Sequence, residues 1–216
     1  MIDEKTNKMT ELELEKLNIV DKQGTVRMTL FNQDHIPPAL MDGEDILPGH
    51  RDDNPFAGIM FFNNEGDECG GMIFGNERDE EGNYRASASM TFDQYKQDQV
   101  VQMMYIDDNG ERHYGFNIFD RPDVSLKQQL DETKEIEESH LDDEAKAEAI
   151  DQVWKGSTQR AFMGKNKKGE VSVKLMDSKG KDRIRMVVDE NDIPRMEFLD
   201  GEGNVLYKLP PDDLKK

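Results

Sequence analysis

Apolar and polar residues alternate with a period of two through most of the chain, as expected for β-strands with one apolar face. Between residues 84 and 92 the apolar side of the pattern consists of Ala86, Ala88, Met90 and Phe92. Four further runs in the last sixty residues repeat it. Their apolar positions are Val171, Val173 and Leu175; Ile184, Met186 and Val188; Met196 and Phe198; and Val205, Tyr207 and Leu209. The alternation predicts antiparallel strands that follow one another as a meander.

A four-residue signal separates many of these runs: Asp or Asn, two further residues, and Gly. Its copies begin at Asp21, Asn63, Asp79, Asp107, Asn166, Asp177 and Asp200. The first side chain accepts hydrogen bonds from its own turn, and glycine adopts the left-handed conformation that lets the chain return. The signal therefore predicts hairpins. An EF-hand would need glycine at its sixth position and a later glutamate, so these turns do not predict calcium sites.

Two stretches depart from the strand pattern. Residues 125–155 contain no glycine or proline, and they predict one or two helices, the second starting near Asp142 and ending at Gly156. Residues 33–55 contain four prolines and many aspartates, which predicts a long irregular loop of a kind that is often functional. Residues 9–18 have the spacing of a short amphipathic helix, although so short a helix needs a packing partner.

The fold class predicted from these patterns is mainly β: antiparallel hairpins with a helical insertion near residues 125–155. We expect residues 17–122 to form a barrel or a sandwich, because the apolar run at residues 59–62 is typical of a strand covered on both sides. Four parts are expected along the chain. They are an N-terminal segment of helical character (1–16), a β-hairpin domain (17–124), the helical insertion (125–156) and a C-terminal β-meander (157–210).

Charge is distributed unevenly. The chain has 47 acidic and 28 basic residues, a formal net charge of −19, which argues against binding to nucleic acids or to anionic membranes. Residues 157–216 hold 13 basic and 11 acidic residues, net +2, so the remainder holds 15 and 36, net −21. Basic residues of the meander alternate away from its apolar positions. They predict an interaction patch made of Lys174, Arg183, Arg185 and Arg195.

No catalytic or metal-binding motif is recognisable, so no catalytic residue, cofactor or metal is expected. The single cysteine, Cys69, cannot form an intrachain disulfide or a cysteine metal cage. The most distinctive polar stretch, residues 91–99, follows a predicted strand near the proline-rich loop. If this region binds a small molecule, the candidate ligand-binding residues are Asp93, Tyr95, Asp98, His113 and Arg121.

Four blocks of sequence, taken together, resemble a family of bacterial proteins for which we know no activity. The blocks are Leu17-Asn18-Ile19-Val20 with Gly24; Phe61-Phe62-Asn63 with Glu65-Gly66 and Gly70-Gly71; Thr91-Phe92-Asp93-Gln94-Tyr95 with Gln97-Asp98-Gln99; and Asp120-Arg121-Pro122. They extend over roughly residues 12–125. The resemblance implies a bacterial origin and a shared β architecture, and it assigns no catalytic residue.

The function expected from the sequence is that of a non-enzymatic binding or assembly module. Hairpin arrays leave unpaired strand edges, which favours a homo-oligomer or a protein partner. The alternative is a small-molecule-binding β-barrel or an enzyme of unknown class. The chain opens without an apolar run, so we expect no signal peptide, no membrane association and a cytoplasmic location.

Overall fold

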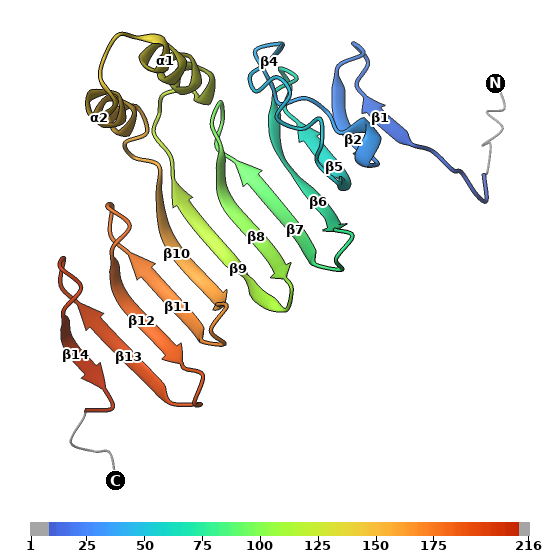
Figure 1. Ribbon diagram of the computed structural model, residues 1–216. Coiled ribbons are helices and arrows are strands. Elements are labelled where there is room, and N and C mark those ends of the chain that lie inside the picture. Colours follow the sequence, from blue (N-terminus) through green and yellow to red (C-terminus); the bar gives the residue numbers. More distant parts are fainter. Residues whose placement is uncertain (1–8, 212–216) are drawn as a thin grey trace, which may run out of the picture.

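The computed structural model describes residues 9–211 and contains one twelve-stranded antiparallel sheet. Its strands lie side by side in chain order, in a single layer (Figure 1). They are β1 (Lys16–Val20), β2 (Val26–Phe31), β5 (Phe56–Phe62), β6 (Glu68–Arg78), β7 (Tyr84–Asp93), β8 (Gln99–Asp108), β9 (Glu111–Asp120), β10 (Thr158–Lys165), β11 (Val171–Met176), β12 (Asp182–Val188), β13 (Pro194–Leu199) and β14 (Val205–Leu209). The predicted mainly β fold of antiparallel hairpins is confirmed.

The sheet is open, and the expected barrel is not formed by the described residues. β1 and β14 are its two edges, and every other strand pairs on both sides. β9 pairs directly with β10 across the helical insertion, so the two β segments expected from the sequence form one continuous sheet. No helix between residues 9 and 211 is long and apolar enough to span a membrane.

The turns form as the sequence predicts, with one exception. In the first hairpin the Asp21 carboxylate accepts hydrogen bonds from the backbone N–H groups of Gln23 and Thr25, and Gly24 has φ +89°. The hairpin after β8 is tighter. Asn109 and Gly110 both have positive φ, at 52° and 91°, which is the geometry of a two-residue type I′ turn.

Residues 32–55 cover one face of the sheet near β2, β5 and β6. This loop contains a short 3₁₀ helix (Gln33–His35) and a two-stranded hairpin, β3 (Leu40–Met41) with β4 (Glu44–Asp45). The buried core consists of Phe31, Met60 and Phe62, against which loop residues pack. The expectation that residues 59–62 are covered on both sides is wrong. Met60 and Phe62 are buried under the loop, whereas Ile59 and Phe61 point to the opposite face and are half-buried.

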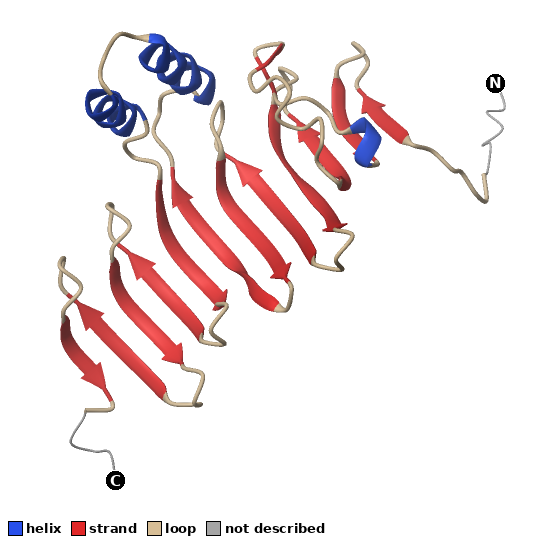
Figure 2. Cartoon of the chain, viewed as in Figure 1, coloured by secondary structure: helices blue, strands red, loops and turns tan. Residues whose placement is uncertain are grey.

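Two helices connect β9 to β10 at one end of the strands (Figure 2). α1 (Leu126–Glu138) begins after Ser125, whose hydroxyl accepts the Gln128 N–H, and α2 (Asp143–Val153) begins after Asp142, whose carboxylate accepts the Ala145 N–H. The predicted insertion is confirmed. The helix suggested for residues 9–18 is not formed, because residues 9–15 are irregular and β1 begins at Lys16. The first eight residues of the predicted N-terminal segment lie outside the described part.

Candidate functional site

One face of the sheet carries an unbroken row of apolar side chains, one from every strand. The register of each neighbouring pair places these residues directly opposite one another across the whole sheet. Six of the twelve are methionines, so we call this line the methionine row. It consists of Leu17, Leu30, Ile59, Met72, Met90, Met103, Phe116, Met163, Val173, Met186, Met196 and Leu209.

Two further rows flank the methionine row and complete what we call the apolar face. One contains Phe92, Val101, Ile118, Ala161, Leu175, Ile184, Phe198 and Tyr207. The other contains Ala57, Phe74, Ala88, Tyr105, Tyr114, Lys165, Val171 and Val188. Lys165 is the single charged residue in the three rows. The face is apolar over its full length.

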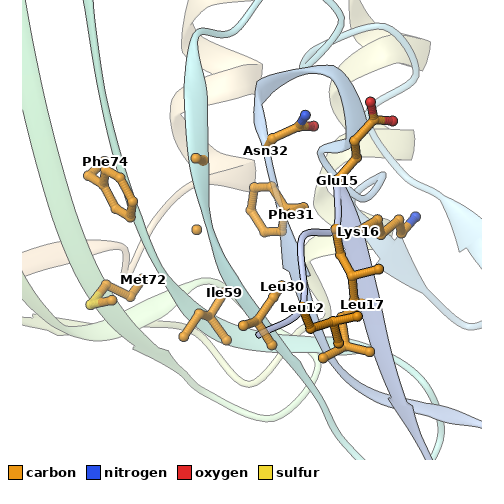
Figure 3. A pocket seen from close by; sticks show the side chains of 13 residues that line it. Leu12, Glu15, Lys16, Leu17, Leu30, Phe31, Asn32, Ile59, Met72 and Phe74 are labelled. Atoms are coloured by element: carbon orange, nitrogen blue, oxygen red, sulfur yellow. The ribbon is translucent and has the colours of Figure 1, made fainter. Parts of the chain in front are cut away.

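No described segment packs over most of this face. Met103 and Met163, near its centre, are 57% and 59% exposed. Figure 3 shows its N-terminal end, where Leu12 lies beside Leu17 and Leu30, with Ile59 and Met72 continuing the line along the floor of a hollow of about 490 Å³. Monomeric soluble proteins rarely expose apolar patches of more than a few hundred Å², so an exposed face of this extent is unusual for a single copy.

The opposite face differs because ion pairs cover its C-terminal part. Arg185 on β12 binds Glu197 on β13, with 2.7 Å between Nη2 and Oε2, and Arg195 binds Glu170 at 3.3 Å and Asp189 at 3.1 Å. All four residues of the predicted interaction patch lie on this face, as expected from the alternation. Lys174 pairs with Asp182 at 3.6 Å and Arg183 with Asp177 at 3.4 Å, so carboxylates neutralise each of the four cations.

The middle of the same face contains a close contact between two glycines. Gly115 on β9 lies opposite Gly164 on β10, and the ring of Phe162 covers both in place of the missing side chains. His113 stacks on Phe162, with ring centroids 5.4 Å apart and planes 6° apart. His113 is the third residue of β9. It lies beside the β8–β9 turn, at the far end of the strands from the other predicted ligand-binding residues.

Of those other residues, Asp93 and Asp98 line a cavity of about 400 Å³ between the loop of residues 32–55, the ends of β6, β7 and β8, and the helices, and Arg121 binds Asp98. Its apolar walls come from the loop and helices and include Leu40, Met41, Leu126, Leu130 and Trp154. Its polar walls come mainly from the strands and the loop and include His50, Arg51, Glu68, Thr91, Asp93, Gln97, Asp98 and Gln99. An adjoining hollow of about 260 Å³ shares His50, Arg51, Glu68, Thr91 and Gln99 with it. The cavity thus combines apolar and charged surfaces.

Two ion pairs frame the polar side of this cavity. Arg51 binds Glu68 at 2.9 Å, and Arg121 binds Asp98 at 2.9 Å. Asp93 lies between them, and the structure gives its carboxylate no hydrogen bond or ion pair with any residue from 9 to 211. Burial, aided by the charges of Glu68 and Asp98, raises the pKa of Asp93 to about 7, although Arg121 and Arg51 oppose the shift.

Tyr95 belongs to a separate cluster around Lys96. The Lys96 ammonium contacts the carboxylates of Asp42, Glu65 and Asp67 at 2.6, 2.9 and 2.7 Å, which raises the pKa of Lys96. The Tyr95 hydroxyl donates to Glu65 at 3.0 Å, and the ring is largely exposed. Lys96 therefore joins the turn before β8 to the loop and to the turn between β5 and β6. We interpret this cluster as structural.

A buried amide pair attaches the helices to the sheet. Gln129 of α1 is fully buried. It accepts a 2.5 Å hydrogen bond from the side chain of Gln97 and donates one of 2.7 Å to the Val153 carbonyl. Trp154 donates to the Thr133 hydroxyl at 3.1 Å. These bonds hold α1 and the end of α2 as a wall of the cavity.

The remaining candidates for chemistry are Cys69 and clusters of metal-ligating side chains. Burial and the nearby Asp93 and Glu68 charges raise the pKa of the half-buried Cys69 thiol, which disfavours the reactive thiolate. Among residues 9–211 no group of three or more His, Cys, Asp or Glu side chains is placed to hold a metal ion.

The structure therefore brings together three of the five predicted ligand-binding residues, Asp93, Asp98 and Arg121, and separates Tyr95 and His113 from them. The sequence analysis missed Arg51 and Glu68, since their pairing depends on how the loop folds back. It recognised most of the apolar positions of the methionine row but not their alignment. No family model, curated protein or solved structure matches the chain, so its function has to be inferred from geometry.

Proposed function

We propose that this protein is a non-enzymatic assembly module, and that its apolar face binds the same face of a second copy. The observation that carries the proposal is the methionine row, an exposed apolar line that crosses all twelve strands. Methionine side chains are unbranched and polarisable, so they adapt to a facing surface without requiring a single close fit. A surface rich in methionine is therefore suited to protein–protein contact.

The area of the face is sufficient for a stable dimer. Eleven strand spacings of about 4.8 Å and about five residues of 3.3 Å along each strand give roughly 900 Å² per copy. A standard protein–protein interface buries about 800 Å² per partner. Two sheets can pack face to face at about 10 Å, with their strands roughly aligned, as in a β-sandwich. A second copy would complete the two-layer arrangement that the single sheet lacks.

The distribution of charge favours a second copy over other occupants. A two-fold axis parallel to the sheet, lying between the two copies over the middle of the apolar face, would place one methionine row against the other, and neither row contains an ionisable side chain. Most carboxylates lie in the turns, on the helices and on the opposite face, outside the three apolar rows. A partner with an anionic surface would instead meet a protein of net charge −19.

Light scattering coupled to size-exclusion chromatography tests the proposal through the mass of the particle. We expect a dimer for the wild-type chain and a monomer for the double variant Met103→Glu, Met163→Glu. The two glutamates would place four carboxylates in the buried centre of the dimer, where uncompensated charge is strongly unfavourable. The far-ultraviolet circular dichroism of the variant should stay that of a β protein, because both side chains are exposed in the single copy.

Leu141→Glu is the matched control. Leu141 lies between α1 and α2, is 48% exposed and also gains one carboxylate on substitution, yet it lies outside the three rows. The control should keep the wild-type mass. A wild-type chain that remains monomeric at about 100 μM, well above the concentration at which micromolar dimers form, would overturn the proposal.

A further inference from the structure

We propose that the cavity beside Asp93 binds a small organic cation with an apolar body, such as a primary amine carrying an aromatic or branched aliphatic group. This inference concerns the side of the sheet opposite the apolar face and does not depend on dimer formation. It rests on the shape of the cavity, on the chemistry of its two walls and on the position of one carboxylate that lacks a partner.

The two walls present different chemistry to a ligand. Leu126 and Leu130 of α1, with Trp154 at the end of α2, form an apolar wall, and β3 contributes Leu40 and Met41. The ends of β6, β7 and β8 form the polar wall. A cavity of about 400 Å³ lies within the range of small-molecule sites, which are mainly apolar with a few convergent polar groups. An amphipathic molecule can satisfy both walls.

The charge balance of the polar wall determines the sign of the ligand. Asp93, Asp98 and Glu68 supply three negative charges when ionised, and Arg51 and Arg121 supply two positive charges, so the sum is −1. Both guanidinium groups are already engaged, by Glu68 and by Asp98. An ammonium group near Asp93 would bring the sum to zero and give its carboxylate a partner. An anion would add to the excess.

Trp154 provides a direct test because it is the single tryptophan of the chain and lines the cavity. The probe is 2-phenylethylammonium, and its neutral analogue 2-phenylethanol has nearly the same shape. We expect saturable changes in tryptophan fluorescence, with binding of the cation tighter than that of the alcohol by about tenfold at pH 8, the effect of one favourable charge contact. Ligand-observed saturation-transfer NMR provides an independent readout of binding.

Two variants separate the charge of Asp93 from its neighbours. Asp93→Asn keeps the shape of the side chain and should remove the preference for the cation over the alcohol. In the wild-type protein the affinity for the cation should fall about tenfold between pH 8 and pH 5.5 as Asp93 takes up a proton. His50 also lines the cavity, so His50→Gln is the control variant and should keep most of the pH dependence.

Four charged groups face Asp93: Glu68 of β6, Asp98 before β8, Arg121 after β9, and Arg51 of the loop. Lys127 of α1 is engaged elsewhere, by Glu44 and Asp131.

Equal affinity for the cation and the alcohol, or a preference that survives in Asp93→Asn, would overturn the inference. The absence of saturable binding in both readouts up to about 10 mM would do the same. The monomeric variant Met103→Glu, Met163→Glu should still bind, so failure of the dimer and failure of this site are distinguishable.

Discussion

Asp93 is a carboxylate whose ionisation is opposed mainly by burial. Its carboxylate lies between two others, Glu68 and Asp98, whose own charges are balanced by guanidinium groups. The contrast with Asp67 is informative. Burial alone would raise the pKa of Asp67, but hydrogen bonds from Lys96, from the Asp42 N–H and from Asn63 hold it below its usual value. The two pKa values thus move in opposite directions because Asp67 accepts hydrogen bonds that stabilise its charge and Asp93 does not.

The pH dependence of stability follows from the pKa of Asp93. The folded-state value of about 7 exceeds the ordinary value of 3.8, so the folded protein retains a proton that the unfolded chain loses. The stabilising effect of this proton is complete below about pH 4 and is lost as the pH rises towards 7. The difference corresponds to an upper limit of about 4 kcal/mol at 1.36 kcal/mol per pKa unit.

Asp93→Asn cannot ionise, so we expect the variant to be more stable than the wild type, and its advantage to grow between pH 5 and pH 8.5. Urea unfolding at both pH values, followed by circular dichroism, measures the difference. Asp123→Asn, in an exposed part of the loop before α1, is the control and should track the wild type. An advantage that is the same at both pH values would show that Asp93 does not titrate as inferred.

At the scale of the element, the strands of the C-terminal part depend on side chains that bridge neighbours. On the side of β12 and β13 opposite the apolar face, charged residues alternate with the buried apolar residues Val187 and Leu199. Glu197 is the most buried of these charged residues, at 6% exposure. Its Oε2 accepts hydrogen bonds from Nε and Nη2 of Arg185, at 3.0 and 2.7 Å. Such a pair replaces the apolar packing that a second layer would provide.

Arg185→Glu should loosen β12, β13 and β14, because it places a carboxylate beside Glu197 and Asp182. Breaking a largely buried pair costs about 3–5 kcal/mol, whereas an exposed pair contributes about 0–1 kcal/mol. Arg183→Glu is the matched control, since Arg183 is on the same strand and face but is exposed and pairs with Asp177 at 3.4 Å. Hydrogen exchange measured by mass spectrometry should rise over residues 182–209 for Arg185→Glu and stay near the wild type for Arg183→Glu. Equal exchange in both variants would exclude this role for Arg185.

At the scale of the whole molecule, an open single-layer sheet has two faces and two edges to protect. The loop of residues 32–55 covers one face near the N-terminal strands, and ion pairs cover that face near the C-terminal strands. The apolar face has neither form of cover along most of its length. Under the proposed function, a second copy removes it from water, and the stability of the fold is then linked to association.

This linkage predicts that the urea midpoint depends on protein concentration. A hundredfold increase should stabilise a dimer by about 2.7 kcal/mol relative to its unfolded chains, whereas a monomer that unfolds in two states shows no change. Urea unfolding measured at protein concentrations of about 1 and about 100 μM tests this dependence. Met103→Glu, Met163→Glu should unfold at the same midpoint at both concentrations. A wild-type midpoint that does not move would contradict association through the apolar face.

The sequence by itself determined the elements and the side on which each residue lies. Strand alternation places every second side chain on one face, and the Asx-x-x-Gly turns reverse the chain after each strand, so the hairpins, the helices at residues 126–138 and 143–153 and the apolar positions were predictable. These features depend on interactions between residues close in the chain, which is why a local pattern is sufficient to recognise them.

The tertiary structure decided how these elements combine. Alternation is the same in a barrel, a sandwich and an open sheet, so the openness of the sheet was not contained in the pattern. Alignment of Met72 with Met163 depends on every intervening register, and the position of Arg51 against Glu68 depends on the path of an irregular loop. The alignment of the row and the Arg51–Glu68 pair both depend on contacts between residues far apart in the chain. Such contacts form only when the sheet and the loop have folded together, so a local pattern does not contain them.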